Sequence, residues 1–165
     1  MAFDSETYRA FVESEMKMAL AGKGPRVFGN RGELYARIVT DVMIENTKSR
    51  LAFLCGYMSA SVYDPARLIE FLNKPNTSVR VILDGPPRAE AIDSALAHLG
   101  DLRSRVQLKK IPYQLGFHFG VADDCHVRRE QDIKDRVASV VFGDKAMASA
   151  ALTTFEKLWH LESAV

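Results

Sequence analysis

The sequence SVRVILDG, residues 78–85, is short, rich in β-branched side chains and followed by two prolines. Such a segment is typical of a strand that is buried on both faces. The sequence RLAFLCGYM, residues 50–58, is also short and is almost continuously apolar. Between the two segments, Pro65 stands where a helix would begin, and residues 66–73 carry apolar side chains at helical spacing. A strand, a helix and a second strand in this order predict a right-handed crossover and a parallel start to the sheet.

Other segments extend this pattern in both directions along the chain. Apolar residues recur at helical spacing in four of them, residues 7–20, 31–45, 89–99 and 146–161. Strand-like runs occupy three more, residues 105–111, 117–129 and 136–142. A polar turn at residues 130–135 would join the last two strands. We therefore expect an α/β domain with a mixed, mainly parallel sheet that is flanked by helices.

The length and the composition fit one domain with one core. The chain has 165 residues, of which 47% are hydrophobic and 26% are charged, as in ordinary globular domains. We divide it into an N-terminal helix and linker, residues 1–30, and a main domain, residues 31–165, which together form one compact unit. The net charge of +1 excludes a global field that attracts nucleic acid or anionic membranes. Any anion binding must therefore come from a local patch.

Features of the chain ends and cysteines indicate a compartment. The acidic start MAFDSE, residues 1–6, lacks the basic and apolar regions of a secretory signal. No stretch approaches the roughly 18 apolar residues that a membrane span needs. Cys55 and Cys125 lie far apart without metal-ligand spacing, so we expect two reduced thiols. We predict a cytoplasmic protein without membrane insertion.

Basic residues gather in the second half of the chain. They are Arg103, Arg105, Lys109, Lys110, Arg128, Arg129 and Arg136. Together they could form a local anion-binding face. The alternative is a solvated surface that Glu130, Asp132 and Asp135 balance. The sequence leaves both interpretations open.

Three strings resemble the phospholipase D-like superfamily. VRVILDG, residues 79–85, is close to the family's usual second strand, and SVVFGD, residues 139–144, with FEKLW, residues 155–159, resembles its final strand and helix. The resemblance covers about residues 31–159 and implies a single-copy half of that fold. In the family, two copies of an H-x-K-x4-D motif meet across a twofold axis. One histidine attacks phosphorus, the other protonates the leaving group, and the lysines neutralise phosphate charge.

The motif itself is incomplete in this sequence. In one alignment His118 takes the histidine position, Gly120 the lysine position and Cys125 the aspartate position. In the other alignment Asp123 takes the aspartate position, which puts Gly116 at the histidine and His118 at the lysine. Neither alignment restores both the histidine and the lysine. The resemblance therefore implies a degenerate motif.

The resemblance also implies roles for individual residues. His118 is the candidate nucleophile or acid, and Asp123 is the candidate group that orients it. Arg128 and Arg129 are candidate phosphate-binding cations, because phosphoryl chemistry needs positive charge where the oxygens become negative. We expect no cofactor and no metal. A regular strand would nevertheless place His118, Asp124 and His126 on one side, which leaves a metal or proton-relay constellation as an alternative.

Three functions are consistent with these residues. The leading hypothesis is a degenerate, catalytically impaired phospholipase D-like module that binds nucleic acid or another phosphate-bearing ligand. The alternative is an active homodimeric phosphodiesterase of the nuclease type that uses His118 from each subunit, and whether the chain is an enzyme stays open. The third is a structural or regulatory protein-interaction domain. A homodimer is what the resemblance implies for single-copy members of the family.

Overall fold

The computed structural model describes residues 3–85 and 95–161 of the chain. Its helices and strands are α1 (Ser5–Leu20), β1 (Arg26–Asn30), α2 (Glu33–Asn46), β2 (Arg50–Cys55), α3 (Pro65–Leu72), β3 (Ser78–Leu83), the 3₁₀ helices η2 (Ala95–His98) and η3 (Gly100–Arg105), β4 (Val106–Lys110), β5 (His118–Ala122), β6 (His126–Asp132), β7 (Val137–Phe142) and α4 (Lys145–Trp159). Most of the expected helix at residues 89–99 lies outside the described residues. Its last part forms η2, and Gly100 begins η3.

The seven strands form one sheet in the order β1-β7-β6-β5-β2-β3-β4. β2, β3 and β4 run parallel to one another, as the alternation of strands and helices predicts. The other four strand pairs are antiparallel. The mixed α/β class is therefore confirmed, but the expectation of a mainly parallel sheet is wrong for the part of the chain that the structure describes.

The sheet is less parallel than expected for two reasons: one predicted strand is two antiparallel strands, and a predicted linker is a further strand. Residues 117–129 were expected to form one strand, whereas the structure has β5 and β6 joined by a tight turn. Asp123 (φ 50°) and Asp124 (φ 61°) adopt the left-handed conformation in this turn, which aspartate tolerates better than most residues. In addition, residues 26–30, which were assigned to a linker, form β1 and pair with β7. The domain boundary at residue 30 stays a prediction.

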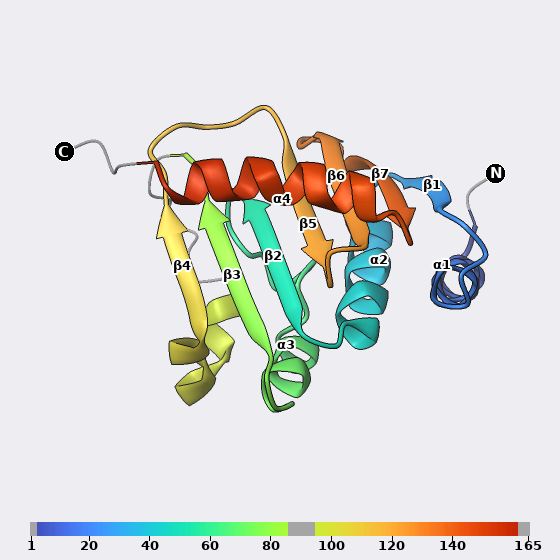
Figure 1. Ribbon diagram of the computed structural model, residues 1–165, viewed down its shortest axis with the longest axis horizontal. Coiled ribbons are helices and arrows are strands. Elements are labelled where there is room, and N and C mark those ends of the chain that lie inside the picture. The colour runs from blue at the N-terminus through green and yellow to red at the C-terminus, as the bar shows by residue number, and fades with distance from the viewer. Residues whose placement is uncertain (1–2, 86–94, 162–165) are drawn as a thin grey trace.

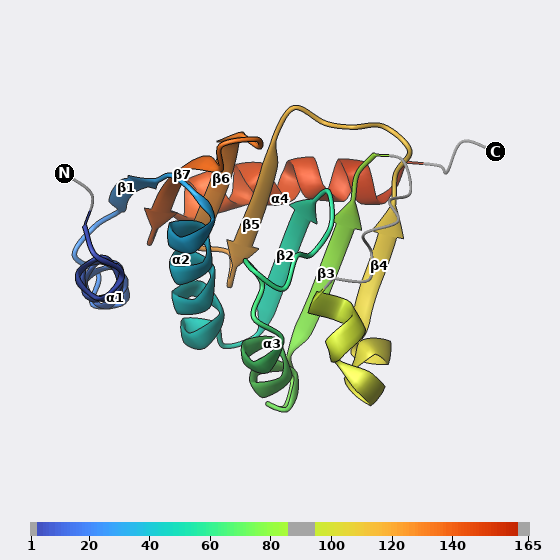
Figure 2. The same cartoon turned by 180° about the vertical axis from the view of Figure 1, so that it is seen from behind.

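Helices cover the two faces of the sheet unequally. α4 crosses one face, while α2 and α3 lie on the other and α1 lies near its β1 end (Figures 1 and 2). Under α1, α2 and α3, the core includes Val12, Val42 and Phe71, which are almost fully buried. Under α4, Phe155 packs edge-on against Phe119 of β5 at 6.5 Å between ring centroids. Because side chains alternate along a strand, the face toward which a residue points depends on its position in the register.

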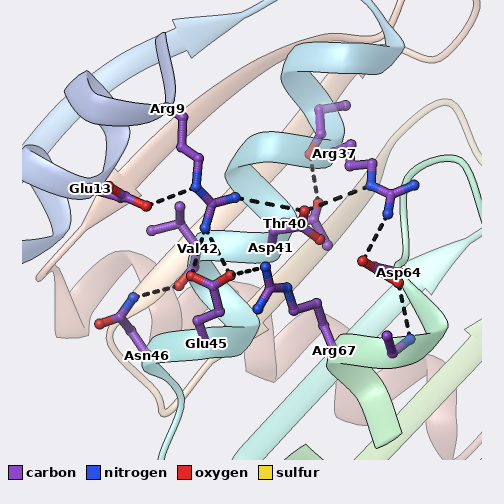
Figure 3. Close-up of polar contacts among 12 residues, drawn as sticks. Arg9, Glu13, Arg37, Thr40, Asp41, Val42, Glu45, Asn46, Asp64 and Arg67 are labelled. Atoms are coloured by element: carbon purple, nitrogen blue, oxygen red, sulfur yellow. Dashed lines mark hydrogen bonds and ion pairs between the residues drawn. The ribbon is translucent and has the colours of Figure 1, made fainter. Parts of the chain in front are cut away.

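Ion pairs connect α1, α2 and α3 with one another (Figure 3). Arg9 of α1 and Arg67 of α3 both contact the carboxylate of Glu45 in α2, at 2.8 and 2.9 Å. Arg37 of α2 reaches Asp64, the N-cap of α3, at 2.8 Å. The arginine side chains are about one-third exposed, and pairs of this kind contribute at most about 1 kcal/mol each. The buried apolar face of each helix therefore supplies most of the packing energy.

Candidate functional site

Four charged or titratable side chains are buried together where β3 ends and β5 begins. We call Asp84, His118, Arg128 and Glu130 the buried charge cluster. Asp84 follows β3, His118 is the first residue of β5, and the other two lie on β6. Their exposed fractions are between 2% and 7%. His118 lies directly opposite Glu130 in the β5–β6 register, and Arg128 is two positions away on the same face.

Each member of the buried charge cluster contacts another. His118 Nε2 lies 3.0 Å from Asp84 Oδ1, and His118 Nδ1 lies 3.7 Å from Glu130 Oε2. Arg128 Nη2 donates to Glu130 Oε1 at 3.1 Å, and its Nε donates to the side chain of Asn30 at 3.1 Å. Arg136 approaches Glu130 at 3.6 Å. The imidazole is therefore held between two carboxylates, and one of those is shared with arginine.

The Asp84 carboxylate has a second partner. Its Oδ2 accepts a hydrogen bond from the backbone N–H of Leu115 at 2.7 Å. Asp84 therefore contacts both the segment before β5 and the imidazole of His118.

The sequence interpretation missed two of these residues. Glu130 was expected in a surface turn, but it lies in β6 with only 2% of its surface exposed. Asp84 was regarded only as the end of a strand. The signal that was present is the alternation of His126, Arg128 and Glu130 at every second position of β6. It was not recognised because charged residues are seldom fully buried unless they are paired.

Burial and the neighbouring carboxylates act in opposite directions on His118. Burial alone lowers the pKa of His118, but the contacts with Asp84 and Glu130 outweigh it and raise the pKa overall. Burial raises the pKa of Glu130, but the contacts with His118 and Arg128 outweigh it and lower the pKa. The protonated imidazole and the ionised carboxylate are thus the forms that the cluster favours.

A pH dependence of stability follows from the raised pKa of His118. The protonated imidazole contributes its full stabilisation below the unfolded-state pKa of about 6.5, and this contribution is lost as the pH rises through the higher folded-state pKa. Urea unfolding of the wild type and of His118→Gln from about pH 5.5 to pH 9 should show their stability difference shrinking with rising pH. If the stability difference between the wild type and His118→Gln stays constant over this range, the pKa of His118 is not raised in the fold.

Gly120 lies where the first alignment places the lysine. It pairs with Phe53 of β2 across the β2–β5 register. A Cβ atom on residue 120 would lie 2.9 Å from Phe53 Cδ1, closer than van der Waals contact allows. Phe53 is 2% exposed and packs edge-on against Tyr63 at 5.1 Å. An aromatic ring therefore fills the space beside the imidazole that a side chain at residue 120 would need.

Asp123 lies at the other end of β5 from His118. Its carboxylate accepts hydrogen bonds from the backbone N–H groups of Lys48, Ser49 and Arg50, the last two at 2.8 and 3.0 Å. Burial raises the pKa of Asp123, but these hydrogen bonds outweigh it and lower the pKa. The structure thus brings Asp84, and not Asp123, to the imidazole of His118. Asp123 instead holds the start of β2.

Arg128 and Arg129 point to opposite faces of the sheet. Arg128 is buried in the charge cluster, whereas Arg129 is exposed on the α4 side. Arg103 and Arg105 donate to backbone carbonyl groups, and Lys109 binds carbonyl oxygens at the end of α4. The structure therefore does not gather these basic side chains on one face.

The His118, Asp124 and His126 constellation is also separated. His126 pairs with Ala122 at the far end of β5, and its Nδ1 accepts from the Gly143 N–H at 3.2 Å. Asp124 pairs with Arg50. Within residues 3–85 and 95–161, no group of three or more His, Cys, Asp or Glu side chains is arranged to hold a metal ion. No helix in the same ranges is long and apolar enough to cross a membrane.

Solved structures with the same architecture are found at low sequence identity. TrmBL2, an archaeal chromatin protein with a novel mode of DNA binding, matches with a TM-score of 0.65 and 15% identity over 97% of this chain. NucT from Helicobacter pylori matches with a TM-score of 0.59 and 13% identity over 81% of this chain and 95% of NucT. Phosphatidylserine synthase from Haemophilus influenzae Rd KW20 matches with a TM-score of 0.52 and 9% identity, over 81% of this chain and 37% of the synthase.

These likenesses define the class of fold. The chain has a phospholipase D-like fold, as the sequence resemblance implied. It spans 63% of the length of TrmBL2. No protein-family model and no curated protein sequence matches the chain.

Proposed function

We propose that this chain is a phospholipase D-like module that binds nucleic acid and has lost phosphodiester hydrolysis at His118. The observation that carries the proposal is the position of the imidazole between Asp84 and Glu130. An attacking histidine needs a free nitrogen lone pair that can reach phosphorus. His118 is 7% exposed, both of its nitrogens face carboxylates, and its pKa is raised. The protonated form has no lone pair to donate.

The charges around His118 also oppose phosphate chemistry. A phosphate in transfer needs fixed cations beside its oxygens. Two carboxylates flank His118 instead, and Arg128 is committed to Glu130 and Asn30. At the position of the family's lysine in the first alignment, Gly120 leaves no room beside Phe53. Arg128 and Arg136, the arginines near His118, both contact Glu130 and are therefore already paired with a carboxylate.

Nucleic acid is the ligand class that the fold comparison favours. TrmBL2, which covers nearly all of this chain, is a chromatin protein that binds DNA. Because the net charge of this chain is only +1, contact with nucleic acid would depend on local side chains. The homodimer and the cytoplasmic location stay predictions, and the mass from light scattering tests the dimer.

A parallel assay of binding and turnover tests the proposal. The purified chain is incubated with single- and double-stranded DNA, RNA and bis(p-nitrophenyl) phosphate, with and without chelator. We expect no turnover above background, together with nucleic-acid binding that weakens as salt rises. Turnover that His118→Ala abolishes would instead establish the phosphodiesterase. A chain with neither binding nor turnover would favour a protein-interaction domain.

A further inference from the structure

A cavity of about 170 Å³ opens on the α4 face of the sheet, on the side opposite the buried charge cluster. Phe117 and Phe119 form one wall, and Met147 and Thr154 of α4 belong to the other. Met147 is 45% exposed although it is apolar. Arg129 lies at the rim, and none of the described residues that line the cavity carries a carboxylate. The cavity is thus apolar inside and positively charged at its edge.

Arg129 differs from the other arginines. Within residues 3–85 and 95–161, every other arginine side chain makes an ion pair or a hydrogen bond. The Arg129 side chain makes neither, and its guanidinium lies 5.7 Å from the centroid of the Phe117 ring. This loose cation–π contact leaves all of its donors available. An anion would therefore bind there without breaking an existing ion pair.

The rings beside Arg129 are arranged as a stack. Phe117 and Phe119 are parallel within 7°, with their centroids 6.2 Å apart. Phe119 is 5% exposed and packs against Phe155, whereas Phe117 is only partly buried. Phe117 is thus the more exposed ring of a stacked pair, and Arg129 lies over it. Such a ring is suited to receive a further planar group.

We infer that this cavity binds single-stranded nucleic acid, with a base stacked on Phe117 and a neighbouring phosphate paired with Arg129. An aromatic platform beside an unpaired arginine is the combination that recognises unpaired strands without sequence preference. Bases within a duplex are already stacked and do not offer a free face. The inference rests on the proposed function and gives that binding a location, away from His118.

Fluorescence anisotropy with a labelled oligothymidylate of about 12 nucleotides tests the inference. Phe117→Leu keeps an apolar side chain but removes the stacking surface, and it should weaken binding about tenfold. Phe117→Tyr keeps the ring and should bind as the wild type does. Arg129→Gln should weaken binding and reduce the slope of log affinity against log salt by about 0.7, the contribution of one phosphate contact.

Lys134→Gln is the matched control for charge, because Lys134 is exposed in the β6–β7 turn. It should leave the affinity and the salt slope unchanged. Wild-type affinity in Phe117→Leu and Arg129→Gln, or binding of duplex alone, would overturn the inference while the proposed function stands. If the wild type binds no nucleic acid, the inference and the proposed function are both wrong. A change of mass in light scattering for Phe117→Leu, with unchanged affinity for the oligonucleotide, would show that a second copy covers the cavity instead.

Discussion

Glu130→Gln should lower the free energy of unfolding by about 3 kcal/mol, because it removes one charge from a buried, paired group. Glu130 is 2% exposed and contacts His118, Arg128 and Arg136. Without its carboxylate, Arg128 keeps only Asn30 as a neutral partner. Breaking a buried ion pair from one side costs about 3–5 kcal/mol, and glutamine retains part of the hydrogen bonding. Urea unfolding at neutral pH measures the difference.

Glu156→Gln is the matched control for Glu130→Gln. Glu156 also pairs with an arginine, Arg80, but it is 45% exposed. Solvent screens that pair, so the same substitution should cost less than about 1 kcal/mol. If both variants lose the same free energy of unfolding, burial does not explain the effect of Glu130→Gln.

The double variant Arg128→Met, Glu130→Leu measures how strongly Arg128 and Glu130 stabilise the fold through each other. Replacing both charges with apolar side chains of similar size leaves neither Arg128 nor Glu130 as a buried charge without its partner. The contacts of Glu130 with Arg136, at 3.6 Å, and with His118, at 3.7 Å, are lost in addition. The double variant should therefore be destabilised by less than the sum of the two single variants, as a double-mutant cycle would show. A sum that is simply additive would mean that Arg128 and Glu130 are not coupled.

Asp123→Ala should destabilise the fold by about 2 kcal/mol, because three backbone N–H groups lose a charged acceptor. These groups belong to Lys48, Ser49 and Arg50, which precede or begin β2. Alanine is also strained at the φ of 50° that Asp123 adopts. The loss of these contacts should loosen the turn between β5 and β6 and the start of β2 together. Thermal unfolding and amide hydrogen exchange of residues 48–50 measure the effect.

Asp124→Ala is the control that removes the strain from the comparison. Asp124 is the next residue, and it too has a positive φ, 61°. With the residues that the structure describes, its side chain makes only an exposed ion pair, to Arg50. The difference between the two alanine variants therefore isolates the hydrogen bonds of Asp123. If Asp124→Ala is equally destabilising, those hydrogen bonds contribute little.

The pH dependence of Asp123 has a definite sign. Its pKa is lowered in the fold, so its contribution is present above the unfolded-state pKa of about 3.9 and is lost as the pH falls through the folded-state value. The stability difference between the wild type and Asp123→Asn should therefore shrink below about pH 4.

The sequence by itself determined the local elements and the class of fold. The apolar spacing predicted α1, α2, α3 and α4, the continuous apolar run predicted β2, and the alternating or β-branched runs predicted β3, β4 and β7. Asp4 caps α1 as its side-chain chemistry indicates, and Pro65 is the first residue of α3. These features depend on residues within a few positions of one another. The strings at residues 79–85, 139–144 and 155–159 together carried the phospholipase D-like resemblance.

Only the tertiary structure decided which side chains meet. Asp84 and His118 are 34 positions apart and come together because β5 lies beside β2 in the sheet. The turn at Asp123 and Asp124 set the register that buries Glu130 opposite His118 and places Arg129 on the other face. A shift of one position in that register would exchange the two faces. Strand pairing between distant segments depends on the packing of the whole core, and the periodicity of one segment does not encode it.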